Sequence, residues 1–444
     1  MVRATPAPGS STTRLRELPA PAAGPHRSLG ATLVCLSAAT ANWDLLGLNV
    51  VGRTVKPTLV LAAAAIGAWF LRAVVSRRAA PRVGPSGSTV VLVTAALILW
   101  LIARASFEPL RVSLPAVTAL VLPAIIYPLA VLVHRQWLRS IANAFVWGMV
   151  LSSVLAAYEW TAQLVHLPRL TSYTATIGTI PRAAGLAYEP AYFASAVLAA
   201  AALCYFTWAR GHQRTIALII LVAGLAAADA RVGVIEAAVI LIAHRMLARG
   251  DRRALLTHRR LVRLLVVGMA MFVGLVALSP GTTSGLTSRL RSFTNRNEVE
   301  SNAVRLQLYD HVSQVVSQHE IFGVGPGALP TEFRKRGYDD EIIQNDVVAN
   351  NILLQALADG GIIAVMLEAV VVLAVLQCAR RARVPALGAA WLGLVMGAGI
   401  TVSNFWDEEP WLILGLILAA GALTAPKGTS AKENHLDVVG RKQP

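Results

Sequence analysis

Apolar stretches of about twenty residues recur along this 444-residue chain, and they constrain its fold more than any other feature. A stretch of this length can cross a bilayer as a helix, because a helix satisfies its own backbone polar groups. Only 14% of the residues are charged, far fewer than a soluble protein of this length needs on its surface. The sequence therefore predicts an all-α fold, a polytopic bundle of membrane helices, rather than two or three soluble domains.

The apolar stretches divide the chain into two membrane parts and one long connection. We expect a disordered cytoplasmic tail over residues 1–28, nine helices within 29–278, an extracytoplasmic loop over 279–348, three helices within 349–425, and a cytoplasmic tail over 426–444. The expected spans lie near 29–50, 57–75, 88–103, 114–134, 138–157, 186–209, 214–229, 232–247, 261–279, 350–378, 384–403 and 409–425.

The net charge of +16 raises the question of nucleic acid binding. The basic residues form no patch or helix face, however, but lie in short clusters between the apolar stretches, so we expect no nucleic acid partner. Every second connection is rich in arginine, as the positive-inside rule requires of cytoplasmic loops. These connections contain Arg72, Arg77, Arg78 and Arg82; Arg135 and Arg139; Arg210 and Arg214; Arg245, Arg249, Arg252, Arg253, Arg259, Arg260 and Arg263; and Arg380, Arg381 and Arg383. The pattern predicts a multi-pass protein of the cytoplasmic (inner) membrane with both termini inside.

Cysteine usage points to no special chemistry. Cys35, Cys204 and Cys378 each lie within an apolar stretch, which favours buried or lipid-facing thiols over disulfides or metal ligands. We expect no metal site and no cofactor. The excess of arginine over lysine and the abundance of alanine are typical of a GC-rich bacterial genome.

The long loop contains signals of local structure. Ser301 or Asn302 is a suitable cap for a helix that runs to about Gln318. Val304, Leu308, Val312, Val315 and Val316 would form one apolar stripe along it. Arg305 lies beside the stripe, where it either contacts an anionic lipid headgroup or is solvated. The glycine-rich residues 321–327 follow and predict a tight turn rather than a nucleotide site, because no βαβ context surrounds them.

Further polar residues lie at the predicted outer ends of spans. Arg182 and Glu189 lie where the chain enters the sixth span, and either they pair with each other or Arg182 meets a phosphate. Arg231 lies in the hairpin between two spans, where it binds a ligand or simply pairs with Asp229. Asn350 and Asn351 open a later span; helix capping accounts for one amide, and the other suggests ligand contact.

Together these residues resemble the superfamily of O-antigen ligases and Wzy-type polysaccharide polymerases. The similarity covers about residues 180–375, and the first five spans match only in being apolar. The corresponding motifs are Arg182 with Gly185; Ala230-Arg231; Arg305 followed by Phe322-Gly323-Val324-Gly325; and Asn350-Asn351 through Gly360.

The resemblance implies a GT-C-like, metal-independent, inverting glycosyltransferase that acts on the outer side of the membrane. Its donor would be a glycan on a polyprenyl diphosphate, and its acceptor a glycan or glycolipid. Arg231 and Arg305 would be catalytic by stabilising the diphosphate, together with Asn350. Arg182, Glu189, Asn351 and His311 would bind substrate.

One departure from the family pattern concerns the base that activates the acceptor. The family ligases have a His where this chain has Asn350, and an amide cannot accept a proton at neutral pH. Another group then serves, or positioning and electrostatics suffice. His311, His319, Glu189 and Asp346 lie on the predicted outer side. The missing His favours a polymerase over a ligase.

Two other classes of function remain open at this point. A transporter or flippase of a lipid-linked precursor would also use outward-facing arginines, but we find no inverted repeat, and Glu236 and Glu368 are the main charges within spans. A scaffold of a cell-envelope complex is the third hypothesis. Chain-length regulators or flippases are further partners that a polymerase would use, besides the membrane lipids.

Overall fold

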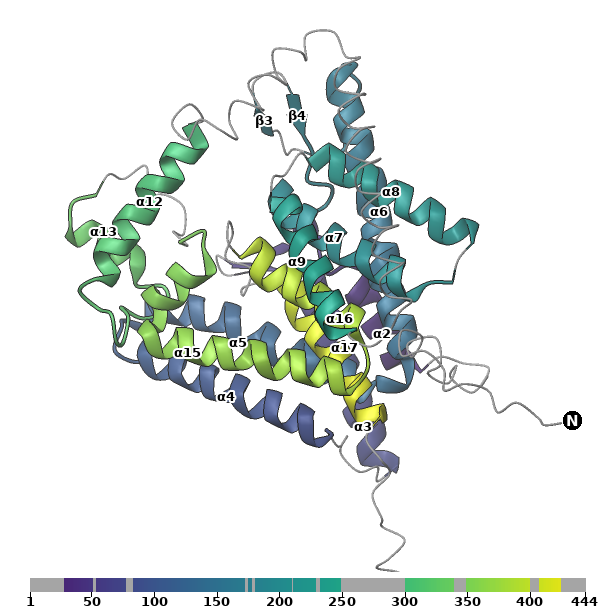
Figure 1. Cartoon of the computed structure of the whole chain (residues 1–444), viewed down its shortest axis with the longest axis horizontal. Coiled ribbons are helices and arrows are strands. Elements are labelled where there is room, and N and C mark those ends of the chain that lie inside the picture. Colours follow the sequence, from purple (N-terminus) through teal and green to yellow (C-terminus); the bar gives the residue numbers. More distant parts are fainter. Residues whose placement is uncertain are drawn as a thin grey trace, which may run out of the picture.

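The computed structural model describes residues 28–50, 53–76, 83–171, 175–177, 180–209, 211–228, 232–248, 300–338, 349–399 and 407–424. This part of the chain is predominantly helical, as the apolar stretches predict (Figure 1). Six of its helices are long and apolar enough to cross a membrane. The chain is therefore an integral membrane protein, while the total of about twelve spans stays a prediction. The expected span at 261–279 and both terminal tails lie outside the described residues.

The helices coincide with the expected spans in most places. They are α2 (Leu29–Ala39), α3 (Pro57–Ser76), α4 (Pro85–Ala105), α5 (Leu110–Val133), α6 (Leu138–Leu164), α7 (Pro190–Thr207), α8 (His212–Ala228), α9 (Val232–Leu247), α15 (Ile352–Arg381), α16 (Pro385–Leu392) and α17 (Glu408–Thr424). Two one-turn helices, η2 (Asp44–Leu46) and η3 (Arg135–Trp137), lie in connections, and η4 (Gly393–Ala398) is a π-helix that continues α16.

The first expected span, 29–50, is wrong in its second half. Helix α2 ends at Ala39, and the chain then forms a hairpin of β1 (Leu48–Val50) and β2 (Arg53–Val55). The polar residues Asn42 and Asp44 end the apolar stretch, and their side chains are used in contacts with α17 and with the segment before α7. A second hairpin, β3 (Ala175–Ile177) with β4 (Ile180–Arg182), precedes α7. The expectation of an all-α fold thus needs these two small sheets as a correction.

Burial divides the helices into central and peripheral ones. Nearly every residue of α7 is buried, and so is most of α17. On the peripheral helices, large apolar side chains are exposed; Leu71 on α3, Leu92 on α4 and Leu373 on α15 have exposed fractions of 68%, 71% and 67%. Exposing this many large apolar side chains to water would be energetically unfavourable. We therefore expect lipid to cover the surface that they form.

Contacts between the connecting segments show which helix ends lie at the same end of the bundle. The connection before α3 meets the start of α17, where Lys56 pairs with Glu408 at 2.8 Å. Leu45 also donates from its backbone N–H to the carbonyl oxygen of Leu186, before α7. We call this end of the bundle, which also holds the α4–α5 connection and α12–α13, the loop end. The opposite end holds the α5–α6, α7–α8 and α15–α16 connections with Arg139, Arg380 and Arg381, and we call it the arginine end.

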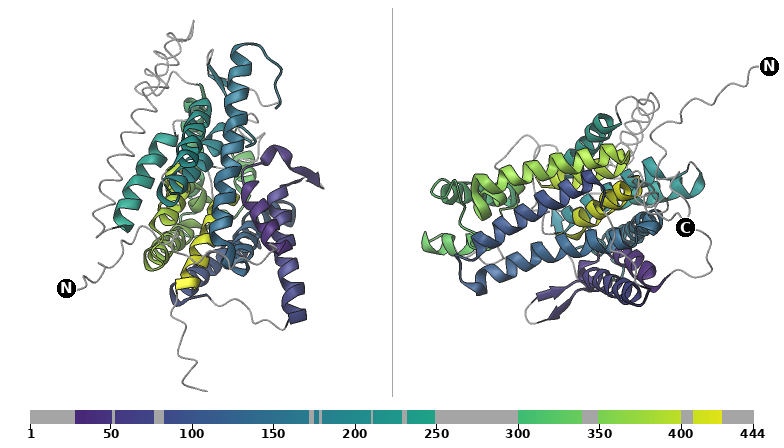
Figure 2. Two further views of the ribbon diagram at one scale, coloured as in Figure 1. Left: turned by 90° about the vertical axis from the view of Figure 1, so that its right-hand side faces the viewer. Right: turned by 90° about the horizontal axis from the view of Figure 1, so that it is seen from below.

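Two helices lie beyond the loop end of α4, α5 and α15. They are α12 (Glu300–Val316) and α13 (Leu329–Lys335), and they stand apart from the rest of the bundle (Figure 1). Figure 2 shows α4, α5 and α15 as neighbouring long helices that lead to them. Helix α12 is the loop helix expected between Ser301 and Gln318. Its assignment to the extracytoplasmic side stays a prediction.

Candidate functional site

The segment after α12 docks onto a break in helix α15. Gly361 has φ 67° and ψ −163°, a conformation that interrupts the helix. The backbone N–H of Val324 donates to the carbonyl oxygen of Ala358 at 2.7 Å, and that of Ile362 donates to Glu320 at 2.8 Å. The carbonyl of Ala358 and the N–H of Ile362 would bond each other in a continuous helix. The break therefore exchanges an internal hydrogen bond for two bonds to the loop.

Two side chains of α4 hold this junction from the other side. Trp100 donates from Nε1 to the carbonyl oxygen of Gly360 at 2.9 Å, and Arg104 donates from Nη2 to that of Gly323 at 3.0 Å. The Arg104 guanidinium also lies 5.2 Å from the ring centroid of Phe107 and 5.9 Å from that of Phe322. The glycine-rich turn predicted for 321–327 is thus a fixed junction of α4, α15 and the loop. The predicted turn is present, and its attachment to α4 was not foreseen.

The apolar stripe of α12 packs into a small core of its own. Leu308, Val312 and Val315 are buried against Phe333 of α13 and Ala358 of α15. Three of the five stripe positions are therefore in the core, Val316 packs against it, and the side chain of Val304 lies outside the described residues. This core fixes the direction in which α12 leaves the bundle.

His311 belongs to the same packing. Its ring stacks on that of Tyr338 with centroids 3.9 Å apart and meets the ring of Phe333 edge-on at 6.2 Å. These contacts give His311 a place between α12 and α13, whereas Tyr309, two residues earlier, faces α15. The predicted substrate contact of His311 stays untested, and the geometry favours a packing role.

Helix α12 contacts the start of α15 through Tyr309. The Tyr309 hydroxyl donates to the carbonyl oxygen of Asn350 at 2.9 Å. Arg305 lies one turn before Tyr309 on α12, and residues four apart share a helix face. The side chain of Arg305 is outside the described residues. The backbone nevertheless brings the positions of Arg305 and Asn350 to one corner of the loop end, which we call the α12–α15 corner.

The two adjacent asparagines at this corner differ in conformation. Asn351 caps α15, and its Oδ1 accepts from the backbone N–H groups of Leu353 and Leu354 at 3.0 and 3.1 Å. Asn350 has φ 48°, in the left-handed region that asparagine tolerates better than most residues. Capping thus accounts for Asn351, as expected for one of the pair. A ligand contact of Asn350 remains a prediction.

A second group of predicted residues lies where β4 meets α8. Arg182 donates from Nε to the carbonyl oxygen of Ala228 at 3.3 Å, and Ala183 donates from its N–H to Ala227 at 3.0 Å. Arg231 lies outside the described residues, between the end of α8 at Ala228 and the start of α9 at Val232. Arg182 therefore contacts a residue that lies three positions before Arg231 in the sequence. Among the described residues no ion pair joins Arg182 with Glu189.

Helix α9 and the π-helix η4 connect the group around Arg182 with the α12–α15 corner. Gly397 of η4 packs directly on Glu236, so closely that an added Cβ would lie 2.5 Å from the Glu236 Cα. The carbonyl oxygen of Gly399, just after η4, accepts from the N–H of Ile352 at 2.7 Å. One continuous set of contacts thus runs from α9, which begins beside Arg231, to the start of α15 beside Asn350.

Glu236 itself is fully buried in this connection. Neither oxygen of its carboxylate has a hydrogen-bond partner within the described part of the chain. The neighbouring Ser195 hydroxyl donates to the carbonyl oxygen of Ala191 instead. A buried carboxylate at a π-helix is a feature that membrane proteins retain at functional positions.

Sequence inspection did not foresee a cluster of charges at the loop end. Lys56 pairs with Asp44 and Glu408, both at 2.8 Å, and Asn42 donates from Nδ2 to Glu409 at 2.5 Å. Burial lowers the pKa of Lys56, but the charges of Glu408 and Asp44 outweigh burial and hold this pKa well above its ordinary value. Burial, followed by the charge of Glu409, raises the pKa of Asp407.

The signal for this cluster is visible in the sequence as the run Asp407-Glu408-Glu409 at the start of an apolar stretch. Three adjacent acidic residues there need a cation, and Lys56 is the basic residue directly before another span. The cluster ties the α2–α3 connection to α17.

The remaining candidate bases lie apart from both groups or outside the described chain. Glu189 precedes α7 and makes no side-chain cap to that helix. His319 is exposed in the turn after α12, and Asp346 is outside the described residues. Within the described ranges, no group of three or more His, Cys, Asp and Glu side chains is placed to hold a metal ion.

Comparison with known proteins matches the part of the chain that contains the α12–α15 corner and Arg231. Residues 216–369 fit the family model described as O-antigen ligase. The matched segment runs from α8 through the start and break of α15, and it covers about a third of the chain. It includes Arg231, Arg305, the loop at Gly323 and the break at Gly361, and it excludes Arg182. A search of curated proteins found no match.

Proposed function

We propose, because residues 216–369 fit the family model described as O-antigen ligase, that this membrane enzyme extends or transfers a polyprenyl-diphosphate-linked oligosaccharide. The acceptor is a glycan or glycolipid on the outer side of the cytoplasmic membrane. A polymerase is favoured over a ligase, because Asn350 stands where the family ligases have a His. The observation that supports this proposal most strongly is the convergence of two family motifs, the loop at Gly323 and the helix break at Gly361, through direct backbone hydrogen bonds.

The proposed donor follows from the compartment. Nucleotide sugars and ATP are cytosolic, so a transferase at the outer surface needs a sugar that crosses the membrane already activated. A glycan on a lipid diphosphate meets this need, because the diphosphate is a leaving group and the lipid anchors the donor next to the bundle. The loop end, with its α12–α15 corner, is the surface at which we expect the diphosphate to bind.

Arg231 and Arg305 are the proposed diphosphate ligands, with Arg182 as a third. A guanidinium binds phosphate oxygens in bidentate geometry and stays charged when it is partly desolvated. In the proposed step the acceptor hydroxyl oxygen attacks the anomeric carbon with inversion, the bond from that carbon to the diphosphate breaks, and the polyprenyl diphosphate leaves. The arginines stabilise the negative charge that develops on the leaving group, so the step needs no metal ion.

The acceptor hydroxyl must also lose its proton during the step. Asn350 cannot take it, because an amide is not basic at neutral pH. We propose that Asn350 positions the acceptor by hydrogen bonding and that the proton passes to a carboxylate of the loop end or to solvent. The Oδ1 atom of Asn351 accepts hydrogen bonds from the first turn of α15. Asn351 therefore contributes indirectly, by capping the helix that begins beside Asn350.

The direct test is chain growth by the purified full chain in proteoliposomes. The donor is a polyprenyl-diphosphate oligosaccharide supplied in the membrane, and products are resolved on a gel. We expect longer glycans with the unmodified protein and losses of at least about a hundredfold, the usual effect of removing a transition-state charge partner, with Arg305→Ala or Arg231→Ala. Arg381→Ala, at the arginine end, is the matched control and should keep full activity.

Two results would overturn the proposal. Absence of any longer product, together with donor that crosses the bilayer unchanged, would identify a transporter instead. Equal losses of activity in Arg305→Ala and Arg381→Ala would contradict the proposal that the diphosphate binds at the α12–α15 corner.

A further inference from the structure

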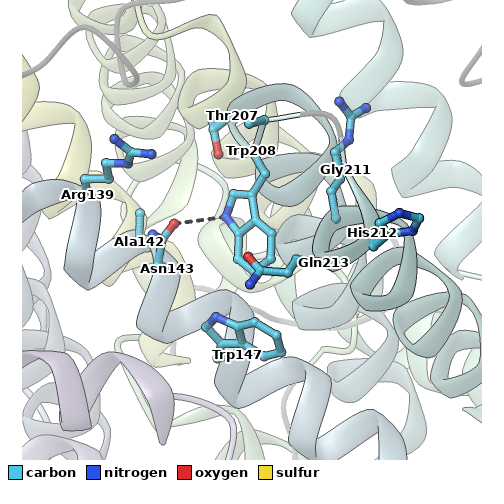
Figure 3. Close-up of a pocket in the computed structure, with 11 residues that line it drawn as sticks. Arg139, Ala142, Asn143, Trp147, Thr207, Trp208, Gly211, His212 and Gln213 are labelled. Carbon is cyan, nitrogen blue, oxygen red and sulfur yellow. Dashed lines mark hydrogen bonds between the residues drawn. The ribbon is translucent and has the colours of Figure 1, made fainter.

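A polar pocket opens at the arginine end, far from the residues used above. It has a volume of about 450 Å³ and lies between α6 and the connection from α7 to α8 (Figure 3). Arg139 and Asn143 come from the first turns of α6, Trp208 follows α7, and His212 and Arg214 come from the first turn of α8. Figure 3 shows Arg139 and His212 on opposite sides of the Trp208 ring.

The charged residues that line this pocket in the described part of the chain are basic. Arg139 and Arg214 contribute guanidinium groups, and none of the residues that line the pocket in the described part of the chain is acidic. The start of α8 adds the positive end of a helix dipole on the same side. The pocket is therefore electrostatically suited to an anion.

Aromatic contacts give the pocket a defined shape. Trp208 donates from Nε1 to Oδ1 of Asn143 at 2.9 Å, which fixes its ring between the two helices. The Trp147 ring lies beside it with centroids 5.3 Å apart. The Arg214 guanidinium lies 4.4 Å from the ring centroid of Tyr205. Tryptophans that combine an apolar ring with a hydrogen-bonding N–H are enriched at the level of lipid headgroups.

An apolar surface continues from the pocket along both helices. Trp147 and Leu151, one turn apart on α6, have exposed fractions of 48% and 54%. Ile216 and Ile219 on α8 are exposed by 55% and 63%. All four lie within two turns of a residue that lines the pocket, on two helices that pack against each other, and we call this surface the α6–α8 face.

We propose that this pocket binds the phosphate of an anionic phospholipid headgroup, with the acyl chains on the α6–α8 face. The two arginines favour phosphate, and the absence of lining carboxylates favours a net negative headgroup over a zwitterionic one. A soluble phosphate compound would use the same polar groups but would leave the exposed apolar face unoccupied. The adjoining face is therefore the reason to assign a lipid. This inference does not depend on the proposed transferase activity.

The test measures lipid binding to the purified full chain in detergent by native mass spectrometry. The probes are phosphatidylglycerol, phosphatidylcholine and glycerol phosphate at equal concentrations. We expect phosphatidylglycerol to bind in preference to the other two, and Arg139→Gln to weaken its binding about fivefold, the effect of one basic residue near an anionic lipid. Arg381→Gln, exposed at the same end but outside the pocket, has the same change in charge and should have no effect.

Arg139 is the residue of choice because its side chain is exposed and its loss removes no packing. Charge reversal in Arg139→Glu should weaken binding further than Arg139→Gln, whereas Arg139→Lys should restore most of it. Equal binding of phosphatidylglycerol and phosphatidylcholine would overturn the proposal, as would equal effects of the Arg139 and Arg381 variants. If glycerol phosphate bound as tightly as phosphatidylglycerol, the ligand of the pocket would be a soluble phosphate compound and not a lipid.

Discussion

Gly323 and Gly361 lie against each other, so that a Cβ atom added to Gly323 would be 2.7 Å from the backbone nitrogen of Gly361. The two residues are far apart in the sequence, and both lie in the segment that fits the family model. A Cβ atom on Gly361 would in turn lie 2.1 Å from the carbonyl oxygen of Ile321. Neither position has room for a side chain, which explains why both are glycine in this chain.

Replacement of Gly361 by alanine is therefore expected to disrupt the junction. The backbone there is in a region that essentially glycine alone adopts, so strain alone costs about 1–3 kcal/mol, and the overlap with Ile321 adds to it. We expect a lower melting temperature in detergent and a large loss of transferase activity. Gly67→Ala is the matched control, because Gly67 lies within α3 with open space around it. That change should be neutral or stabilising by about 0.5–1 kcal/mol.

Arg104 should be required for the position of the loop rather than for the stability of α4. Its Nη2 bond to Gly323 and its contacts with Phe107 and Phe322 all involve the junction or its surroundings. Loss of a hydrogen bond from a charged group costs about 1.5–3 kcal/mol. We expect Arg104→Gln to increase amide hydrogen exchange at Val324 and Gly325 while the exchange of α4 stays unchanged.

The Trp100→Phe variant tests the same junction from the neighbouring contact. It loses the Nε1 bond to Gly360 but keeps a ring near Phe322. Faster exchange at Val324 and Gly325 is expected here also, to a smaller extent. If exchange in both variants increased equally along the whole of α4, the two residues would be stabilising the helix and not the loop.

The helices could be predicted from the sequence, and most of their contacts could not. A long apolar stretch predicts a helix such as α3 or α15, because in lipid the backbone N–H and C=O groups must form hydrogen bonds within the segment. The same criterion failed at 29–50, since the residues after Ala39 are still largely apolar but leave the helix, and Asn42 and Asp44 there contact distant segments. Apolar length also could not reveal the break at Gly361, because a glycine within an apolar stretch is equally compatible with a continuous helix.

The sequence proposes a set of candidate site residues, whose roles stay predictions, but it does not reveal their arrangement. The order of motifs identified Arg182, Arg305 and Asn350, and the structure adds that Tyr309 joins the helix of Arg305 to Asn350. Tyr309 carries no sequence signal, because a tyrosine on an amphipathic helix is ordinary. The cluster around Lys56 was missed for a related reason: its members come from separate connections, and only the packing of the loop end brings them together.

Removal of Lys56 should destabilise the protein strongly. Lys56→Met leaves the buried carboxylate of Glu408 and the half-buried carboxylate of Asp44 without their cation, and breaking a fully buried pair on one side costs about 3–5 kcal/mol, which is the upper bound here. Thermal unfolding in detergent measures the loss. The double variant Lys56→Met with Glu408→Gln removes one of the uncompensated charges and should recover part of the stability. A double variant less stable than Lys56→Met alone would contradict the pairing.

The same cluster should make stability depend on pH. Burial and the charge of Glu409 raise the pKa of Asp407 in the folded protein, so Asp407 contributes stability that is complete below its unfolded pKa of about 3.9 and is lost as the pH rises through the folded value. Lys56 stays charged across this window, since its pKa is raised and not lowered. We expect the melting temperature to fall as the pH rises above the unfolded pKa of about 3.9.

Asp407→Asn should flatten this dependence. The amide is neutral at every pH, so the variant should be more stable than the unmodified protein at the alkaline end and similar to it at the acidic end. Glu332→Gln, in the exposed pair with Lys335 on α13, is a control that changes one carboxylate outside the cluster. A melting temperature of Asp407→Asn that falls with pH as steeply as that of the unmodified protein would exclude Asp407 as the source.

Asn350→His tests whether the missing family histidine limits the reaction. The backbone at this position, with φ 48°, accepts histidine as well as asparagine, whereas valine there is strained by about 1–3 kcal/mol. Asn350→His should therefore keep the melting temperature of the unmodified protein, and Asn350→Val should lower it. The histidine adds a proton acceptor with an ordinary pKa of about 6.5 beside the proposed acceptor site.

If acceptor deprotonation limits transfer, the rate of Asn350→His should rise through that pKa by about a hundredfold relative to the unmodified protein, the lower end of the range for a general base. The pH–rate profile of chain growth in proteoliposomes measures this rise. Asn350→Gln provides an amide control of larger size and should show no added dependence on pH. A profile of Asn350→His parallel to that of the unmodified protein would mean that residue 350 does not face the acceptor hydroxyl, and the positioning role proposed for Asn350 would then fail with it.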